Sequence, residues 1–321
     1  MKKFRIPATD NHFSQLLPAI FLFVFAAVFV PVIGPFFLFL LPMILFLNGT
    51  VNGIIKTSAV FFFSFSLLLL LAVLLRLDVP AIAVFTMGAV GIFMTLIAGK
   101  NFSVEKTIIY PALFIIGVIC FYFIYDAAVL GANPWQLVKN YITATIAENV
   151  KLYSQLPLKA EDINIIKDNE KNIISGFIQI FPSIVVILSI FTTWVNLLLG
   201  KNYLGRAGIV YPRFTLLARW KAPEKIIWIF IASGALFFIP QKDINFLSLN
   251  IFLVVCFVYL LQGLAIVSFL FQSKNVPGFF RYLFYFLIAV QQILMIPIMA
   301  IGLFDIWVDF RKLFQKDQTA V

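Results

Sequence analysis

The stretch that decides the fold is FLSLNIFLVVCFVYLLQGLAIVSFLF, residues Phe246–Phe271, which contains no charged side chain. A helix needs about 20 mainly apolar residues to cross the hydrocarbon core of a bilayer, because every backbone amide must find its partner within the segment. This stretch is long enough to cross the bilayer as one helix. It therefore predicts a membrane-spanning α-helix.

The composition of the chain extends this prediction to its whole length. Of 321 residues, 62% are hydrophobic and 12% are charged, whereas a soluble domain is about half apolar and roughly a quarter charged. No soluble fold could bury this much apolar surface. We expect an all-α fold, a polytopic transmembrane helix bundle that forms a single integral membrane domain over residues 1–321.

Nine segments are apolar enough to be candidate spans, and two of them are short. Pro35–Leu47 has nearly the length of a re-entrant or interfacial segment, so the sequence predicts 8–9 spans. The candidates are Gln15–Ile33, Pro35–Leu47, Thr57–Leu75, Pro80–Ala98, Thr107–Leu130, Ile173–Leu199, Ile226–Pro240, Phe246–Phe271 and Phe279–Phe304.

Lysine and arginine residues predict the orientation of these spans. They fall on alternate loops, and Gly200–Glu224 is the most basic loop. Because short positively charged loops are retained in the cytoplasm, we expect a cytoplasmic amino terminus. Nine spans would place Arg311 and Lys312 outside and eight would place them inside, so the sequence leaves this side open.

The net charge of +10 does not indicate a nucleic-acid-binding protein. Such a protein gathers its basic residues on one solvated face, whereas here they are scattered between apolar runs. Lysine and arginine at these places bind anionic lipid headgroups. We therefore expect the lipid bilayer as a partner and no nucleic acid.

One polar insertion, Gly131–Lys171, interrupts the apolar pattern, and the predicted orientation places it outside. Pro134 is suited to the first turn of a helix, and apolar residues then recur at spacings of three and four, which predicts an amphipathic helix. This helix either lies on the membrane surface or forms a lid over a central cavity. Its apolar residues are Trp135, Val138, Ile142, Ile146, Val150 and Tyr153.

The sequence offers little for catalysis. His12 is the only histidine, which excludes a His-Glu-x-x-His zinc site and a Ser/His/Asp triad on this chain. There is no P-loop, and across the spans Asp126 is the only ionisable candidate that is not clearly in a loop, although membrane-embedded ionisable groups usually mark a site. We expect no enzyme, no cofactor and no metal site.

Uncharged polar side chains within the spans are the remaining candidates for a ligand site. Amide side chains in lipid form hydrogen bonds between helices, or they line a polar cavity for a small solute. The five candidates are Gln179, Asn196, Gln262, Gln291 and Gln292. Prolines within the spans, Pro42, Pro182 and Pro297, are expected to kink them.

Three motifs carry a resemblance to a known family. They are Arg219-Trp220-Lys221-Ala222-Pro223 with Trp228, Gln262-Gly263-Leu264-Ala265, and Gly302-x-x-Asp305-x-x-x-Asp309-Phe310-Arg311. The chain resembles the YybS-like family of bacterial integral membrane proteins, a domain of unknown function. The resemblance implies the bacterial cytoplasmic membrane, and it marks Arg219, Trp220, Pro223, Trp228, Gly263, Asp305, Asp309 and Arg311.

The helical arrangement of that family is distantly similar to the substrate-binding membrane subunits of energy-coupling-factor vitamin transporters. Those subunits dock through a stripe of alanines on the first span, which here reads Ala19, Phe23, Ala27. The resemblance implies a substrate-binding membrane subunit or permease-like protein for a small organic solute, without its own ATPase. The alternative is a non-transporting scaffold or regulator that holds a membrane or cytoplasmic protein partner.

For two groups of motif residues, the sequence is compatible with two interpretations each. Arg219 to Trp228 either anchors a span at the headgroups or binds a phosphorylated ligand or lipid headgroup. Asp305, Asp309 and Arg311 either pair with one another or bind a partner.

Overall fold

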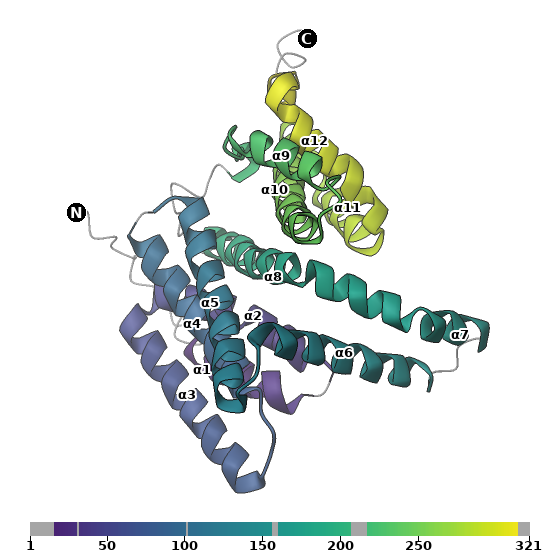
Figure 1. The fold of residues 1–321 in the computed structure, drawn as a ribbon. Helices are drawn as coiled ribbons and strands as arrows, with labels where there is room; N and C mark the ends of the chain where they lie inside the picture. The colour runs from purple at the N-terminus through teal and green to yellow at the C-terminus, as the bar shows by residue number, and fades with distance from the viewer. Residues whose placement is uncertain (1–15, 31, 101, 156–159, 207–216, 314–321) are drawn as a thin grey trace. The chain divides into compact units, whose positions relative to one another are not determined.

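The computed structural model describes residues 16–30, 32–100, 102–155, 160–206 and 217–313, and all the regular secondary structure in these ranges is helical (Figure 1). His12 and the rest of the predicted cytoplasmic amino terminus lie outside the described residues, as does part of the basic loop. The chain divides into two compact units, Met1–Pro134 with Leu188–Thr215 and Trp135–Ile187 with Leu216–Val321. Each unit is described by itself.

Unit 1 is built on contacts of α2 with α4 and α1. Gly91 of α4 allows a close approach, because a Cβ atom there would lie 2.5 Å from the carbonyl oxygen of Pro42. An apolar core that includes Ile20, Leu45 and Phe61 fills the space between the helices. The helices are α1 (Leu16–Phe29), α2 (Gly34–Val51), α3 (Ile54–Leu75), α4 (Ala81–Gly99), α5 (Val104–Leu130) and the second half of α8 (Glu170–Arg206).

Unit 2 is organised around α10, which contacts α9, α12 and the short helix η2. Gly263 of α10 and Gly302 of α12 let these two helices touch backbone to backbone, because a Cβ atom at Gly302 would overlap the carbonyl oxygen of Tyr259. The elements are α6 (Pro134–Tyr153), α7 (Ala160–Asp168), the first half of α8, η2 (Leu217–Arg219), α9 (Ile226–Leu236), α10 (Lys242–Ser273), α11 (Gly278–Val290), η3 (Gln292–Leu294) and α12 (Met295–Val308).

The number of helices able to cross a membrane is smaller than the sequence predicted. In the described chain six helices are long and apolar enough, namely α2, α3, α4, α5, α8 and α10, or seven if α11 and α12 form one span. The apolar parts of α1 and α9 are shorter helices, so the predicted 8–9 spans are not confirmed. By contrast α2, predicted from Pro35–Leu47 as a doubtful span, extends to Val51 and qualifies.

The predicted span Phe279–Phe304 is not one continuous helix. The helices α11 and α12 meet at a bend of 108°, where Gln291 leaves helical geometry with φ −102° and ψ 86°. The sequence did not reveal this break, because Gln291 and Gln292 lie between two apolar segments and are also compatible with an unbroken helix. Pro297 does not kink a span either, since it lies in the first turn of α12, where a helix tolerates proline.

The predicted amphipathic helix is confirmed as α6. It begins at Pro134 and buries Val138, Ile142 and Val150, which belong to the apolar face expected from the spacing. The insertion also contains α7, which the sequence analysis did not predict. Its position outside the membrane stays a prediction.

Candidate functional site

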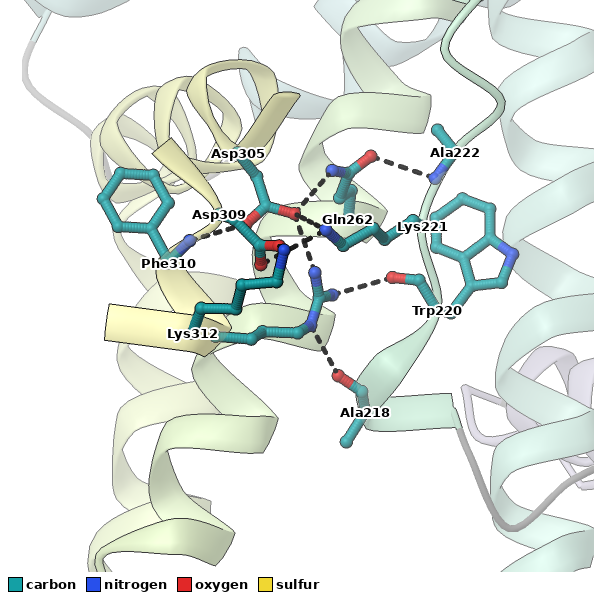
Figure 2. Close-up of polar contacts among 10 residues, drawn as sticks. Ala218, Trp220, Lys221, Ala222, Gln262, Asp305, Asp309, Phe310 and Lys312 are labelled. Carbon is teal, nitrogen blue, oxygen red and sulfur yellow. Dashed lines mark hydrogen bonds and ion pairs between the residues drawn. The ribbon is translucent and has the colours of Figure 1, made fainter. Parts of the chain in front are cut away.

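A buried polar network forms around Asp305 in the last turn of α12 (Figure 2). Asp305, Gln262 and Arg311 lie at its centre, and it is called here the Asp305 cluster. Asp309 ends α12 in the left-handed conformation with φ 45°. The chain therefore turns back, and the Phe310 amide donates a hydrogen bond to Asp305 Oδ1 at 3.0 Å. The other carboxylate oxygen, Oδ2, accepts from Arg311 Nη1 at 2.7 Å and from Gln262 Nε2 at 3.1 Å.

Arg311 and Gln262 connect this carboxylate to the segment before α9. Arg311 donates through Nη2 to the carbonyl oxygen of Trp220 at 2.7 Å and through Nε to that of Ala218 at 3.3 Å. Gln262 Oε1 accepts from the Ala222 amide at 3.0 Å. The Asp305 cluster thus joins three parts of unit 2, which are the segment 218–222, α10 and the residues that follow α12 (Figure 2).

The centre of this cluster is almost completely shielded. Asp305 is 1% exposed, Gln262 2% and Arg311 6%. A buried ion pair is tolerated only when its charges and remaining polar groups are matched, and here Asp305 and Arg311 meet that condition. The Asp305 cluster is therefore closed, with no unsatisfied group at its centre for a ligand to contact.

The rim of the Asp305 cluster, formed by Lys221, Asp309 and Lys312, is more exposed than the centre. Lys221 lies 3.3 Å from Asp309 Oδ1 and 3.8 Å from Asp305 Oδ2, and Lys312 lies 3.1 Å from Asp309 Oδ2. Burial opposes ionisation of Asp309, but hydrogen bonds from Lys312 and Lys221 and the attraction of both ammonium groups outweigh it. The pKa of Asp309 consequently lies below its ordinary value.

The structure separates the family-motif residues into two groups. Pairing of Asp305 with Arg311 is confirmed, while Asp309 pairs with Lys221 and Lys312 instead. Trp220 and Gly263 also lie in or beside the Asp305 cluster, whereas Arg219, Pro223 and Trp228 are exposed. Asp305 was not among the ionisable candidates of the spans, because it lies in α12 just beyond Phe304, the predicted end of the last span.

The side chain of Asn196 forms hydrogen bonds with the backbone of α2 in unit 1. Its amide accepts from the Met43 amide at 2.9 Å and donates to the Phe39 carbonyl at 2.9 Å. These two groups of α2 are four residues apart, as in a regular helical hydrogen bond, and Pro42 stands directly before Met43. A proline disturbs this ladder, and a neighbouring helix can satisfy the freed groups. Asn196 is fully buried and acts as an interhelical bridge.

The same arrangement recurs in unit 2 at Pro182. Asn250 of α10 accepts from the Ser183 amide at 2.8 Å and donates to the Gln179 carbonyl at 2.9 Å. Asn250 was not among the candidate residues predicted from the sequence. The signal was present, because asparagine in an apolar helix needs partners and a proline in another helix supplies them.

The side chain of Gln179 points to a different place, an open cleft in unit 2. Its amide nitrogen donates to Asn245 Oδ1 at 3.2 Å, and Asn245 donates to the Phe237 carbonyl at 2.8 Å. The cleft has a volume of about 820 Å³ and is formed by α6, α8, the turn before α10 and the first turn of α10. It is lined by Trp135, Lys139, Ser175, Ile178, Gln179, Ile239, Pro240, Gln241, Lys242, Asp243, Asn245 and Phe246.

The five candidate ligand residues therefore do not form one site. Asn196 bridges helices in unit 1, Gln262 belongs to the Asp305 cluster, and Gln179 lines the cleft. Gln291 and Gln292 are exposed at the break between α11 and α12. Among the described residues, their side chains have no hydrogen bond to the other three candidates.

Comparison with known proteins provides a family. The chain matches the model of a family described as predicted membrane protein (DUF2232) over residues 19–306. The chain belongs to the DUF2232 family. The match includes most of the residues of both units, with Gln179, Gln262 and Asp305 among them. Searches of curated proteins and of solved structures found no match, so this DUF2232 protein takes no function from a relative.

Proposed function

We propose that this DUF2232 protein is a substrate-binding membrane subunit or permease-like protein for a small organic solute, without its own ATPase. The observation that carries the proposal is the cleft of unit 2. Its volume of about 820 Å³ falls within the roughly 300–1,000 Å³ of small-molecule sites. Such sites combine apolar walls with a few polar groups, and here Trp135 and Phe246 accompany Gln179 and Asn245.

The proposal assigns ligand contact to Gln179 and not to the other amide candidates. Gln179 is partly exposed in an open cleft, so it can exchange water for a solute. Gln262 and Asn196 already use both atoms of their amide groups within the protein. Their side chains hold helices together.

The amphipathic helix supports a role in solute binding over simple attachment to the membrane surface. Two residues on one side of α6, Trp135 and Lys139, line the cleft. The Trp135 ring contacts the Phe246 ring of α10 edge to face, with 5.7 Å between centroids. In this proposal α6 forms one wall of the solute site.

The same proposal includes the family resemblance, the membrane and the orientation that were predicted from the sequence. The protein is YybS-like, is distantly similar to the energy-coupling-factor subunits, and lies in the bacterial cytoplasmic membrane with its amino terminus inside. The stripe Ala19, Phe23, Ala27 packs into unit 1, where Ala27 is buried and Gly34 lies against its carbonyl group. An ATPase module would therefore have to dock on another surface. Catalysis is not part of the proposal.

A scaffold or regulator is the second candidate. The observation that favours it is the exposure of two tryptophans that are close in sequence to residues of the Asp305 cluster, Trp228 at 71% and Trp307 at 63%. Tryptophan is common both at membrane interfaces and in protein interfaces. A membrane protein partner could cover these two side chains.

Native mass spectrometry of the full chain, extracted gently from its own membrane, tests the proposal. We expect a stoichiometric small molecule that is lost in Gln179→Leu and retained in Gln272→Leu, a matched change at an exposed glutamine of α10 outside the cleft. A retained protein partner without any small molecule would favour the scaffold. A wild-type protein that carries neither would contradict the solute-binding proposal.

A further inference from the structure

The cleft also contains the charged side chain of Lys139. Lys139 follows Trp135 by four residues on α6, so both side chains leave the same face of the helix. Lys139 is partly buried and lines the cleft. Within the described residues its ammonium group has no ion pair and no hydrogen bond.

The cations of the Asp305 cluster differ from Lys139 in having carboxylate partners. There, each shielded or half-shielded cation has a carboxylate partner, Arg311 with Asp305 and Lys221 with Asp309. Taking an ammonium group partly out of water weakens its hydration, and an opposite charge offsets that loss. Among the described residues no carboxylate lies within ion-pair distance of the Lys139 ammonium group, although Asp243 lines the same cleft.

The charged residues that line the cleft have a net positive charge. Its charged lining residues are Lys139, Lys242 and Asp243, which leaves a positive excess. Asp243 lies in the first turn of α10, where the helix dipole stabilises a carboxylate. A negatively charged solute therefore meets a favourable field in the cleft.

The other lining groups indicate which chemical features the rest of the solute would have. The rings of Trp135 and Phe246 form an apolar wall that suits a flat hydrocarbon part. The Gln179 amide nitrogen is bound to Asn245, and no described group donates to its oxygen. That oxygen can accept a hydrogen bond from a hydroxyl or amine of the solute.

We infer that the solute of the cleft is an organic anion with a flat apolar part, and that Lys139 binds its carboxylate or phosphate group. The inference rests on the proposed function and names the class of solute. The anion can be a water-soluble metabolite or the headgroup of a bilayer lipid, since both offer the same chemistry.

Equilibrium dialysis of the full chain in phosphatidylcholine nanodiscs tests the inference with benzoate, phenyl phosphate and uncharged benzamide. We expect the wild type to bind the two anions about tenfold more tightly than benzamide. Lys139→Gln should remove this preference and Lys139→Arg should keep it. Lys151→Gln, at an exposed lysine of the same helix outside the cleft, should behave as the wild type.

The possible failures are distinguishable. Equal binding of all three probes, unchanged in Lys139→Gln, would overturn the inference and leave a solute-binding cleft. Absence of binding of every probe, together with no retained small molecule in the native mass spectrum, would overturn the proposed function as well.

Nanodiscs with phosphatidylglycerol separate the two sources of the anion. If a lipid headgroup occupies the cleft, this lipid should displace benzamide as well as benzoate, because both compete for the same space. If the solute is water-soluble, benzamide binding should stay the same. Once the dialysis experiment has shown the preference for anions, this second experiment identifies whether the anion is a lipid or a water-soluble solute.

Discussion

The Asp305 cluster and the cleft both include residues of α10, yet a glutamine side chain has a different role in each. In the cluster, Gln262 is 2% exposed and hydrogen-bonds through both atoms of its amide. In the cleft, Gln179 is partly exposed and uses only its amide nitrogen. A glutamine in an apolar helix is thus a structural bridge in one place and a ligand candidate in another. Burial and the number of available partners make the difference.

The largest effect is expected at the centre of the Asp305 cluster. Arg311→Met should destabilise the protein by about 3–5 kcal/mol, because it leaves a buried carboxylate without its counter-ion. Unfolding in mixed detergent micelles would measure this loss. The double change Arg311→Met with Asp305→Asn should recover more than half of it. A loss below about 1 kcal/mol in the single variant would show that the pair is not buried as described.

A matched pair of glutamine substitutions tests the comparison directly. Gln262→Leu should cost about 1–3 kcal/mol, because the buried Ala222 amide loses its acceptor. Gln179→Leu should cost less than about 1 kcal/mol, because water reaches Asn245. The same unfolding measurement applies to both variants. Equal losses would mean that the cleft is as closed as the Asp305 cluster.

The rim of the Asp305 cluster should contribute little. Asp309→Asn is expected to cost less than about 1 kcal/mol at neutral pH, because the ion pairs with Lys221 and Lys312 are partly solvated. The pKa of Asp309 is lowered in the folded state, so its contribution is present above the unfolded value of about 3.9. It disappears as the pH falls through the lowered pKa. Stability measured against pH should therefore converge for wild type and variant in acid.

Single cysteines should change stability least and can place the two regions relative to the membrane. Arg311 bonds the carbonyl of Trp220, so residues just after α12 lie on the same side as the segment before α9. In a chain without Cys120 and Cys256, Lys225→Cys and Lys312→Cys should react with a membrane-impermeant reagent from the cytoplasmic side. Asp243→Cys, in the cleft, should react from outside if Ile226–Pro240 crosses the membrane, as the sequence predicts. Labelling of Lys225→Cys and Lys312→Cys from opposite sides would refute the shared position.

Several elements could be predicted from local patterns alone. The helix α6 begins at Pro134 and buries Val138 and Ile142, because the spacing of its apolar residues repeats with the helical period. The pairing of Asp305 with Arg311 was one of two expected alternatives, since the residues lie close together in the sequence. The break at Gln291 was not predicted, because two adjacent glutamines between apolar segments are also compatible with an unbroken helix.

The amino-acid sequence by itself determined that this is a helical membrane protein of several spans, since apolar content and span length follow from residues that are neighbours in the chain. Only the tertiary structure decided which polar residues are bridges and which line a cleft. Gln262 meets Asp305 because Gly263 and Gly302 bring α10 and α12 into backbone contact. Gln179 meets Asn245 across two helices. Such partners are distant in the sequence, and a hydrogen bond depends on distance in space.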